Sequence, residues 1–182
     1  MIDPAAGKIL ISEPFLQDPN FSRTVVLLTE HNELGTIGFV LNQLTDFTVS
    51  QLVDGCEHIK APVFQGGPVS LESFNYIHTN NEITESAKIS DGLFWNGNFN
   101  DVIEGVKLDV FKPETFRFFM SYSGWAPGQL KGEINEGAWL VSDIRNEDIF
   151  SCTDEELWKI AIKNLGGRDA LLANSPKDPW LN

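Results

Sequence analysis

Residues 124–133, Gly-Trp-Ala-Pro-Gly-Gln-Leu-Lys-Gly-Glu, constrain the fold more than any other part of this chain. Gly137, Ala138 and Trp139 follow closely. Glycine permits backbone conformations and close approaches that a side chain forbids, whereas tryptophan anchors a loop by burying a large ring against apolar surface. The pattern therefore predicts a loop that leads into a short helix and has one specific shape. It indicates a site without naming a reaction.

The length and composition are those of one ordinary globular domain. The chain has 182 residues, of which 42% are hydrophobic and 21% are charged, which is enough for a substantial core and short for two domains. The first twelve residues lack a basic start followed by an apolar run, and no window reaches the roughly 18 apolar residues of a membrane span. We therefore expect a cytoplasmic protein without a membrane-spanning segment.

Acidic residues outnumber basic residues two to one, 26 against 13, so the formal net charge is −13. No two Lys or Arg residues are adjacent in the sequence. Binding to DNA depends on clustered cations that neutralise several phosphates, and an acidic protein is repelled at long range. The charge therefore disfavours nucleic acids and anionic membranes as partners. It leaves a protein partner or a small polar ligand, and it leaves the oligomeric state open.

Cysteine and histidine are too sparse to indicate a metal site. Cys56 and Cys152 are the only cysteines, and they lie far apart without a Cys-x-x-Cys spacing. A structural zinc site needs about four ligands. We predict reduced, partly buried thiols, no bound metal and no cofactor, and a disulfide between the two cysteines stays open at this stage.

Short apolar runs separated by turn residues predict a first half rich in β-strands. Residues 24–29 have many β-branched side chains and are typical of a buried central strand. The turn composition of residues 31–35 joins this strand to the next one as a hairpin. The expected strands are residues 8–12, 24–29, 36–41, 61–65, 74–78, 93–96, 115–122 and 138–142.

Two amphipathic helices stand out in the second half. Asn98 can cap the first, which carries apolar residues at positions i, i+3, i+4 and i+7 and ends before Pro113. The second begins at Thr153, has Glu156 three positions later in a capping-box pattern, and ends at Gly166-Gly167. Shorter helices are expected at residues 48–53 and 129–136.

One domain accounts for nearly the whole chain. No internal repeat, low-complexity tract or linker-like break interrupts it, so we assign residues 1–170 to a single α+β domain. Residues 171–182 contain two prolines and are expected to form an extended C-terminal tail. Its Trp180 is expected to pack back on the domain or to dock on a neighbour.

Several of these motifs resemble the YqgE/AlgH family in order and spacing, from Gly7 to about Gly166. The resemblance implies an α+β domain of coiled, bifurcated, mixed or antiparallel β-sheets with peripheral helices, in a bacterial cytosolic protein. The family is labelled a transcriptional regulator, and the resemblance transfers no catalytic residue and no ligand. The motifs are residues 7–14, 18–28, 31–32, 35–42, 66–69, 124–130, 137–140 and 157–158.

Three positions depart from the family pattern. Ala126 stands where glycine is usual, and Lys131 stands where an acid is usual. Gln43-Leu44 follows Asn42 where Arg-Pro is common. This last change removes a basic residue from a candidate site and weakens any proposal of anion binding there.

We predict a small polar pocket beneath the loop of Trp125. Gln129 and Glu133 are four residues apart and share one face of the expected helix, and Gly66-Gly67 offers backbone N–H groups that can hold an anion. The alternative is that the polar groups hydrogen-bond one another or the backbone and so fix the loop, as buried polar groups usually do. The candidate ligand-binding residues are His31, Asn32, Asn42, Gly66, Gly67, Trp125, Gln129 and Glu133.

Three functions are compatible with these features. The leading interpretation is a non-enzymatic regulatory or adaptor domain whose effect on transcription is indirect, through a protein partner or a small ligand. An enzyme acting on a small metabolite, with Glu133 or His31 as acid or base, is the alternative, but Ser123 lacks the leading glycine of a nucleophile elbow and no phosphate- or dinucleotide-binding glycine motif occurs. Direct DNA binding is suggested by the family label and opposed by the charge.

Overall fold

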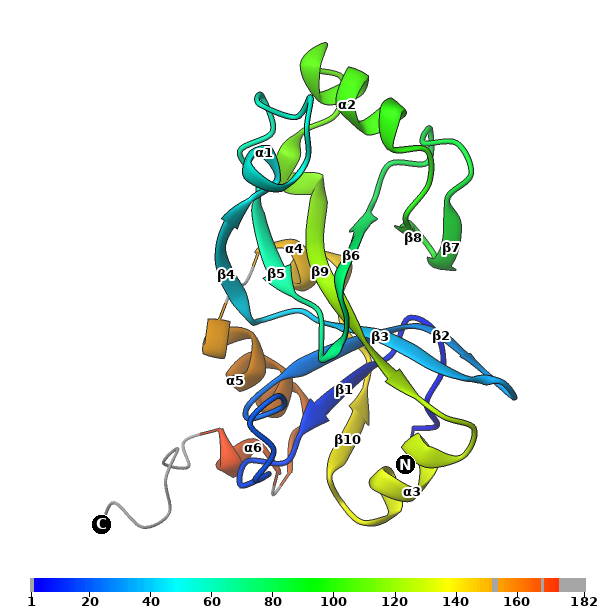
Figure 1. The fold of residues 1–182 in the computed structure, drawn as a ribbon. Coiled ribbons are helices and arrows are strands. Elements are labelled where there is room, and N and C mark those ends of the chain that lie inside the picture. Colours follow the sequence, from blue (N-terminus) through cyan, green and yellow to red (C-terminus); the bar gives the residue numbers. More distant parts are fainter. Residues whose placement is uncertain (1, 152–153, 168, 174–182) are drawn as a thin grey trace.

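A forked, twisted sheet organises the molecule (Figure 1). The computed structural model describes residues 2–151, 154–167 and 169–173. Within these ranges ten strands form one sheet, with the main order β10-β1-β2-β3-β9-β6-β8-β7, and β5 joins β9 and β4 off this path. The strands are β1 (Ile9–Ser12), β2 (Val25–Asn32), β3 (Gly35–Val40), β4 (Leu44–Thr48), β5 (Pro62–Gln65), β6 (Val69–His78), β7 (Ala87–Ser90), β8 (Leu93–Trp95), β9 (Phe116–Trp125) and β10 (Trp139–Ser142).

Helices lie around the sheet, and the longest two are amphipathic (Figure 1). As expected, the Asn98 side chain caps the first of these by accepting a hydrogen bond from the Asn100 N–H. The helices are α1 (Val49–Leu52), α2 (Phe99–Lys107), α3 (Gln129–Asn135), α4 (Asn146–Ser151), α5 (Asp154–Leu165) and α6 (Asp169–Leu172), with a 3₁₀ turn η1 (Pro113–Thr115). The α+β class and the single domain are thus confirmed. No helix within the described ranges is long and apolar enough to cross a bilayer.

The fork lies on β9, the strand shared by both parts of the sheet. It pairs in parallel with β5 and antiparallel with β6 up to Tyr122, and its last three residues pair antiparallel with β3. Just before this switch, where the register with β6 shifts, Ser121 has a positive φ of 60°, a conformation uncommon for residues other than glycine and typical of a bulge that bends a strand. The Ser121 hydroxyl donates to the Gly67 carbonyl at 2.6 Å, which fixes the bend.

Three apolar clusters fill the space on either side of this sheet. Alternate side chains of β9 point to opposite faces, so Phe118 enters the cluster beneath α1 and α2, whereas Phe119 enters the cluster covered by α5. The third cluster packs Trp125 and Trp139 beneath α3 with Leu130. Each end of β9 is therefore attached to a different core, and the Trp125 end is held by α3 and β10.

All eight expected strands have counterparts in the structure, with shifted ends. Residues 31–35, expected as a turn, supply the ends of β2 and β3 and leave only residues 33–34 as the loop. The strand expected from residue 74 begins five residues earlier, at Val69. Strands β4 and β7 and helix α4 were not predicted, because β4 is largely exposed and in β7 only Ile89 is buried, so neither has an apolar run.

Some expectations fall outside the described residues. The cap at Thr153, the thiol of Cys152 and the chain from residue 174 onward, including Trp180, belong to this group. Residues 171 and 172, expected as the start of the extended tail, instead form the end of helix α6 (Asp169–Leu172). Cys56 is a buried free cysteine in the cluster beneath α1 and α2. Burial, with a smaller contribution from the Glu57 carboxylate, raises the pKa of its thiol.

Candidate functional site

One carboxylate, that of Glu133 on α3, holds the two indoles of the loop region. The Nε1–H groups of Trp125 and Trp139 both donate to Glu133 Oε2, at 2.9 and 2.8 Å. The Gln129 side-chain amide donates to Glu133 Oε1 at 2.9 Å, and Gln129 Oε1 accepts from the Ala126 N–H at 3.0 Å. Hydrogen bonds to an ionised acceptor are stronger than neutral ones. The polar groups named for this loop are therefore partnered with one another.

Glycines set the path of the chain through this network. Gly128 adopts φ 78° immediately before α3, and Gly137 adopts φ 82° immediately after it, both in the left-handed region that favours glycine. A Cβ on Gly35 of β3 would lie 2.6 Å from the Trp125 carbonyl oxygen. The two bends turn the chain into and out of α3, and the bare Gly35 backbone lets the β2–β3 hairpin pack directly on the Trp125 loop.

Three aromatic rings form the floor of this region. The centre of the Phe21 ring lies 6.3 Å from the ring centre of Trp125 and 5.2 Å from that of Trp139. The ring centres of the two indoles are 6.1 Å apart in an edge-to-face arrangement. Such pairs add about 0.5–1.5 kcal/mol beyond the area they bury. A hollow of about 310 Å³ opens beside the rings and is also lined by Asp18, Gln129 and Glu133.

His31 and Asn32 lie at the end of the β2–β3 hairpin. His31 Nδ1 lies 2.7 Å from the Thr36 hydroxyl across the hairpin. The Asn32 side chain accepts from the Leu34 N–H at 2.8 Å and donates to Glu30 at 2.6 Å. Both side chains therefore shape the turn, and the turn leaves Leu34 87% exposed.

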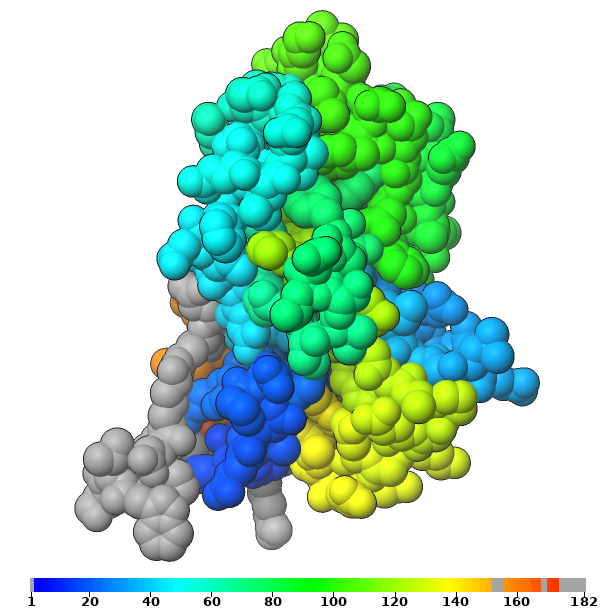
Figure 2. Space-filling model, in the orientation of Figure 1, coloured from blue at the N-terminus to red at the C-terminus, as the bar shows by residue number. Residues whose placement is uncertain are grey.

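Two hollows flank the hairpin where it meets the Trp125 loop. The larger, of about 490 Å³, is lined by His31, Asn32, Gly128 and Lys131 among others. The smaller, of about 390 Å³, lies between the hairpin and β9 and is lined by Leu34 together with Asn32 and Trp125. Figure 2 shows the hairpin, in lighter blue, projecting beyond the body of the molecule beside the yellow-green segment that contains α3.

The other candidate residues, Asn42, Gly66 and Gly67, lie in another part of the sheet, where Asn42 and Gly66 hydrogen-bond backbone groups. Asn42 is buried, accepts from the Val25 N–H and donates to the Arg23 carbonyl, both at 2.9 Å. Gly66 and Gly67 are buried at the fork of the sheet. The expectation of open N–H groups there was wrong for Gly66, because its N–H donates to the Met120 carbonyl and a Cβ would lie 2.6 Å from the Ser121 carbonyl oxygen. The structure thus brings together His31, Asn32, Trp125, Gln129 and Glu133, and it separates Asn42, Gly66 and Gly67 from them.

Residues that were not predicted complete the surface. Thr36 partners His31, Phe21 completes the aromatic floor, and Lys131, known only as a departure from the family pattern, lines the largest of the hollows. Phe21 lies within the motif of residues 18–28, which is the one signal that could have indicated it. Ser123 is 1% exposed and donates to the Gly66 carbonyl at 3.0 Å, so it supports the fork. Among the described residues, no group of three or more His, Cys, Asp or Glu side chains is placed to hold a metal ion.

Comparison with known proteins decides the family. A profile described as AlgH-like matches residues 9–170. A UPF0301 protein of Chlorobaculum parvum is 39% identical over 178 residues, which cover 97% of this chain and 95% of that protein. The chain belongs to the AlgH-like family. A second family member, a UPF0301 protein of Cytophaga hutchinsonii, is 37% identical and covers 97% of this chain and 98% of its own length.

Two solved structures share the fold. The solution structure of AlgH from Pseudomonas aeruginosa matches with a TM-score of 0.73 and 26% identity, over 97% of this chain and 98% of that one. A crystal structure of a Corynebacterium diphtheriae protein matches with a TM-score of 0.79 and 23% identity, over 96% and 94% of the two chains. The second likeness, at this identity, speaks for the fold alone. The resemblance stated from the sequence motifs is confirmed.

Proposed function

We propose that this AlgH-like protein is a non-enzymatic, cytoplasmic binding domain that acts in regulation through contact with another protein. The contact surface in this proposal is the end of the β2–β3 hairpin together with the two hollows beside it. The proposal rests chiefly on Leu34, a large apolar side chain that is 87% exposed on a turn held by Asn32. An apolar side chain raised on a rigid turn is suited to enter a pocket of a partner.

The Glu133 network supports a preformed surface. Each indole N–H and each Glu133 oxygen already has a hydrogen-bond partner within the loop and α3. A surface that is ordered before binding loses less conformational entropy on association. The same network is evidence against Glu133 as a proton-transferring group, because both of its oxygens are engaged in holding side chains.

The charge of the molecule supports an indirect effect on transcription. At −13 the whole chain repels a duplex. The surface proposed here carries Glu30 and Lys131 on different sides of the hairpin. A protein partner therefore suits this surface better than phosphate groups.

The proposal is tested by an allele that changes only the exposed apolar group. Leu34→Ser is compared with Leu108→Ser, a matched control because Leu108 is also exposed and lies at the end of α2. Both variants are expected to stay within about 0.5 kcal/mol of the parent in stability, as exposed substitutions usually do. Transcript profiles of the two alleles are measured against a deletion of the gene and against the parent. We expect Leu34→Ser to reproduce the profile of the deletion and Leu108→Ser to match the parent.

Other outcomes would overturn separate parts of the proposal. A deletion without effect on transcripts removes the regulatory role, and a Leu34→Ser profile equal to that of the parent removes the hairpin surface. Fluorescence anisotropy with labelled duplex DNA near physiological salt checks the charge argument. Tight binding with a steep salt dependence would show direct DNA recognition. Turnover of a metabolite that is abolished by Glu133→Gln in a folded protein would show an enzyme instead.

A further inference from the structure

A separate hollow of about 470 Å³ lies at the opposite end of β9. It opens between β5, the start of β9, the η1 turn and the end of α4. Its described lining shares no residue with the hollows around the hairpin. Part of this wall is apolar, formed by Phe64 and Phe150 with Ala61, Pro62, Pro113 and Phe116.

A buried cation forms another part of the wall. Arg117 is only 3% exposed, its guanidinium carbon lies 4.4 Å from the centre of the Phe64 ring, and it donates to the Leu41 carbonyl. These contacts fix the direction of the guanidinium. A charge in such a low-dielectric wall acts over a greater range than one surrounded by water.

The local charge balance is the reverse of that of the chain. Lys60 and Arg117 are the basic Lys or Arg residues and Glu114 is the one acid among the described lining residues, whereas in the whole chain acids outnumber bases 26 to 13. His58 also faces the hollow, and its Nε2 lies 3.1 Å from the Ile103 carbonyl oxygen. Because a carbonyl can only accept, Nε2 carries a hydrogen there.

We propose that this hollow binds a small organic anion, with its carboxylate or phosphate toward Arg117 and Lys60 and its apolar body against Phe64 and Phe150. The volume falls within the range of about 300–1,000 Å³ typical of small-molecule sites. The combination of a mostly apolar wall with a few directed polar groups is also typical of such sites. Arginine suits both groups because its planar N–H donors match the oxygens of carboxylate and phosphate.

The proposal predicts a preference that depends on charge. The probes are 1-naphthoate, 1-naphthyl phosphate, neutral 1-naphthalenemethanol and cationic 1-naphthylmethylammonium, which share one ring system. Binding is followed by ¹H–¹⁵N correlation spectra, in which the Nε–H signal of Arg117 reports on the guanidinium directly. We expect one or both anions to move this signal and the amide signals of Lys60 and Phe150. The neutral and cationic probes should bind at least about tenfold more weakly, which corresponds to one well-placed charge contact.

Two substitutions at the rim change the charge without touching the core. Lys60 and Glu114 are both exposed, so Lys60→Gln and Glu114→Gln should fold normally. Lys60→Gln should weaken anion binding by about threefold and Glu114→Gln should strengthen it by a similar factor, as single exposed charges do. The control is Lys88→Gln, an exposed lysine of β7 outside this hollow, which should bind like the parent.

Several results would overturn this inference. The site is wrong if neither anion shifts the Arg117 signal at about 10 mM, the weak limit for a useful small-molecule contact. It is equally wrong if the neutral probe binds as tightly as the anions, or if Lys60→Gln and Glu114→Gln both bind like Lys88→Gln. A preference for one anion identifies the ligand group, since carboxylate and phosphate probes differ only there.

Discussion

The two ends of β9 use polar groups in opposite ways. At the Trp125 end, Glu133 joins residues that lie only four to eight positions away, and its half-buried carboxylate accepts three N–H groups. At the other end, the buried Arg117 donates to Leu41, which is 76 positions away. The first arrangement shapes one loop and helix. The second connects β9 with the segment that directly follows β3, in a distant part of the chain.

This difference indicates which contacts support the whole fold and which support a surface. A contact between near neighbours in sequence can break while the rest of the sheet stays folded, because proteins open in local units. A buried contact that joins distant segments of the chain, such as that of Arg117 with Leu41, holds the sheet itself together. We therefore expect substitutions at the Arg117 end to act globally and substitutions at the Trp125 end to act locally.

The largest effect is expected for Arg117→Met. The substitution keeps much of the apolar stem but removes the donor to the Leu41 carbonyl and the cation above Phe64. Leaving a buried acceptor without its donor costs about 1–3 kcal/mol, and lost packing adds to it, so we expect a loss of about 2–4 kcal/mol. Denaturation in urea measures this free energy of unfolding.

Lys107→Met is the control for that experiment. The Lys107 side chain is 62% exposed and pairs with Glu104, which is equally exposed, on the surface of α2. Exposed ion pairs contribute about 0–1 kcal/mol, so this variant should lie close to the parent. Equal losses for Arg117→Met and Lys107→Met would contradict a special role for the Arg117 end.

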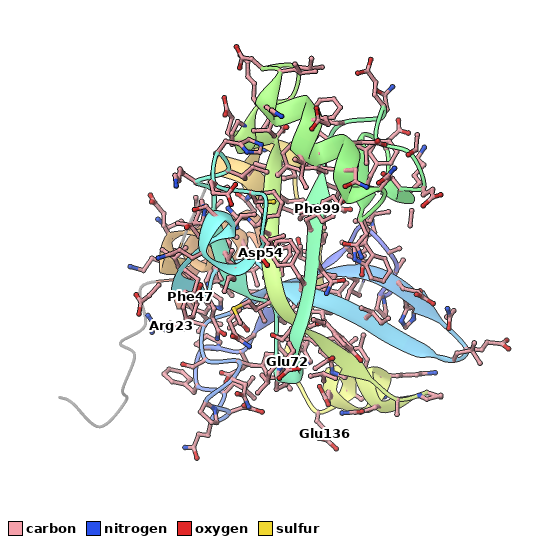
Figure 3. All side chains as sticks on the ribbon, turned by 45° about the horizontal axis from the view of Figure 1, so that its top comes forward. Arg23, Phe47, Asp54, Glu72, Phe99 and Glu136 are labelled. Carbon is pink, nitrogen blue, oxygen red and sulfur yellow. The ribbon has the colours of Figure 1, made fainter. Side chains whose placement is uncertain are left out.

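A smaller effect is expected for Glu133→Gln. The amide keeps one oxygen for the indoles but loses the charge. Its NH₂ group would face the NH₂ group of Gln129, so that two donors lie opposite each other without an acceptor. Hydrogen bonds to charged groups contribute about 1.5–3 kcal/mol each, but here a neutral bond replaces them in part, so we expect about 1–2 kcal/mol. Urea denaturation again gives the value. Glu136→Gln is the control, since Glu136 is exposed at the end of α3 and is labelled at the lower edge of Figure 3; a loss as large in this variant would contradict the role of Glu133.

The smallest effect concerns His78, which is buried and paired in register with Phe116. Burial lowers the pKa of His78 below its usual value of 6.5, although backbone hydrogen bonds with Asn96 and Asn80 oppose this. Below about pH 6.5 the unfolded chain therefore binds a proton that the folded chain resists. The free energy of unfolding decreases as the pH is lowered, by at most about 1.4 kcal/mol per pH unit. Above that pH the two states carry the same charge at this residue.

Replacement of His78 by glutamine isolates this contribution. The variant has a different stability overall, but between pH 6.5 and 5 (a window set by the usual His value of about 6.5) its stability should fall less steeply than that of the parent. Urea denaturation at several pH values measures both slopes. Above pH 7.5, about one unit past that value, the two proteins should show parallel behaviour. Equal slopes in the acidic window would contradict the account of His78.

Local contacts could be predicted from the sequence, and long-range contacts could not. The pairing of Gln129 with Glu133 follows from their spacing of four residues on a helix. The two indoles that share Glu133 could not be placed, because their directions depend on the left-handed turns at Gly128 and Gly137.

The same limit explains the separation of the candidate residues. Asn42 supports the Val25 backbone, and Gly66 supports the fork through Met120. Both roles arise from strands that meet only in the folded sheet. Sequence order places these residues among the family motifs, but it carries no information on which strand each one faces. The fold class could be predicted because hydrophobic runs and turn residues act locally.

Native-state hydrogen exchange of Glu133→Gln tests the comparison most directly. If Glu133 holds a local surface, amides of residues 124–130 and 139–142 should lose protection from exchange. The amides of Val26 in β2 and Phe119 in β9 should stay as protected as in the parent, once the change in the global free energy of unfolding is subtracted. A uniform loss across the whole sheet would contradict the account, because it would show that the loop and the sheet unfold as one unit.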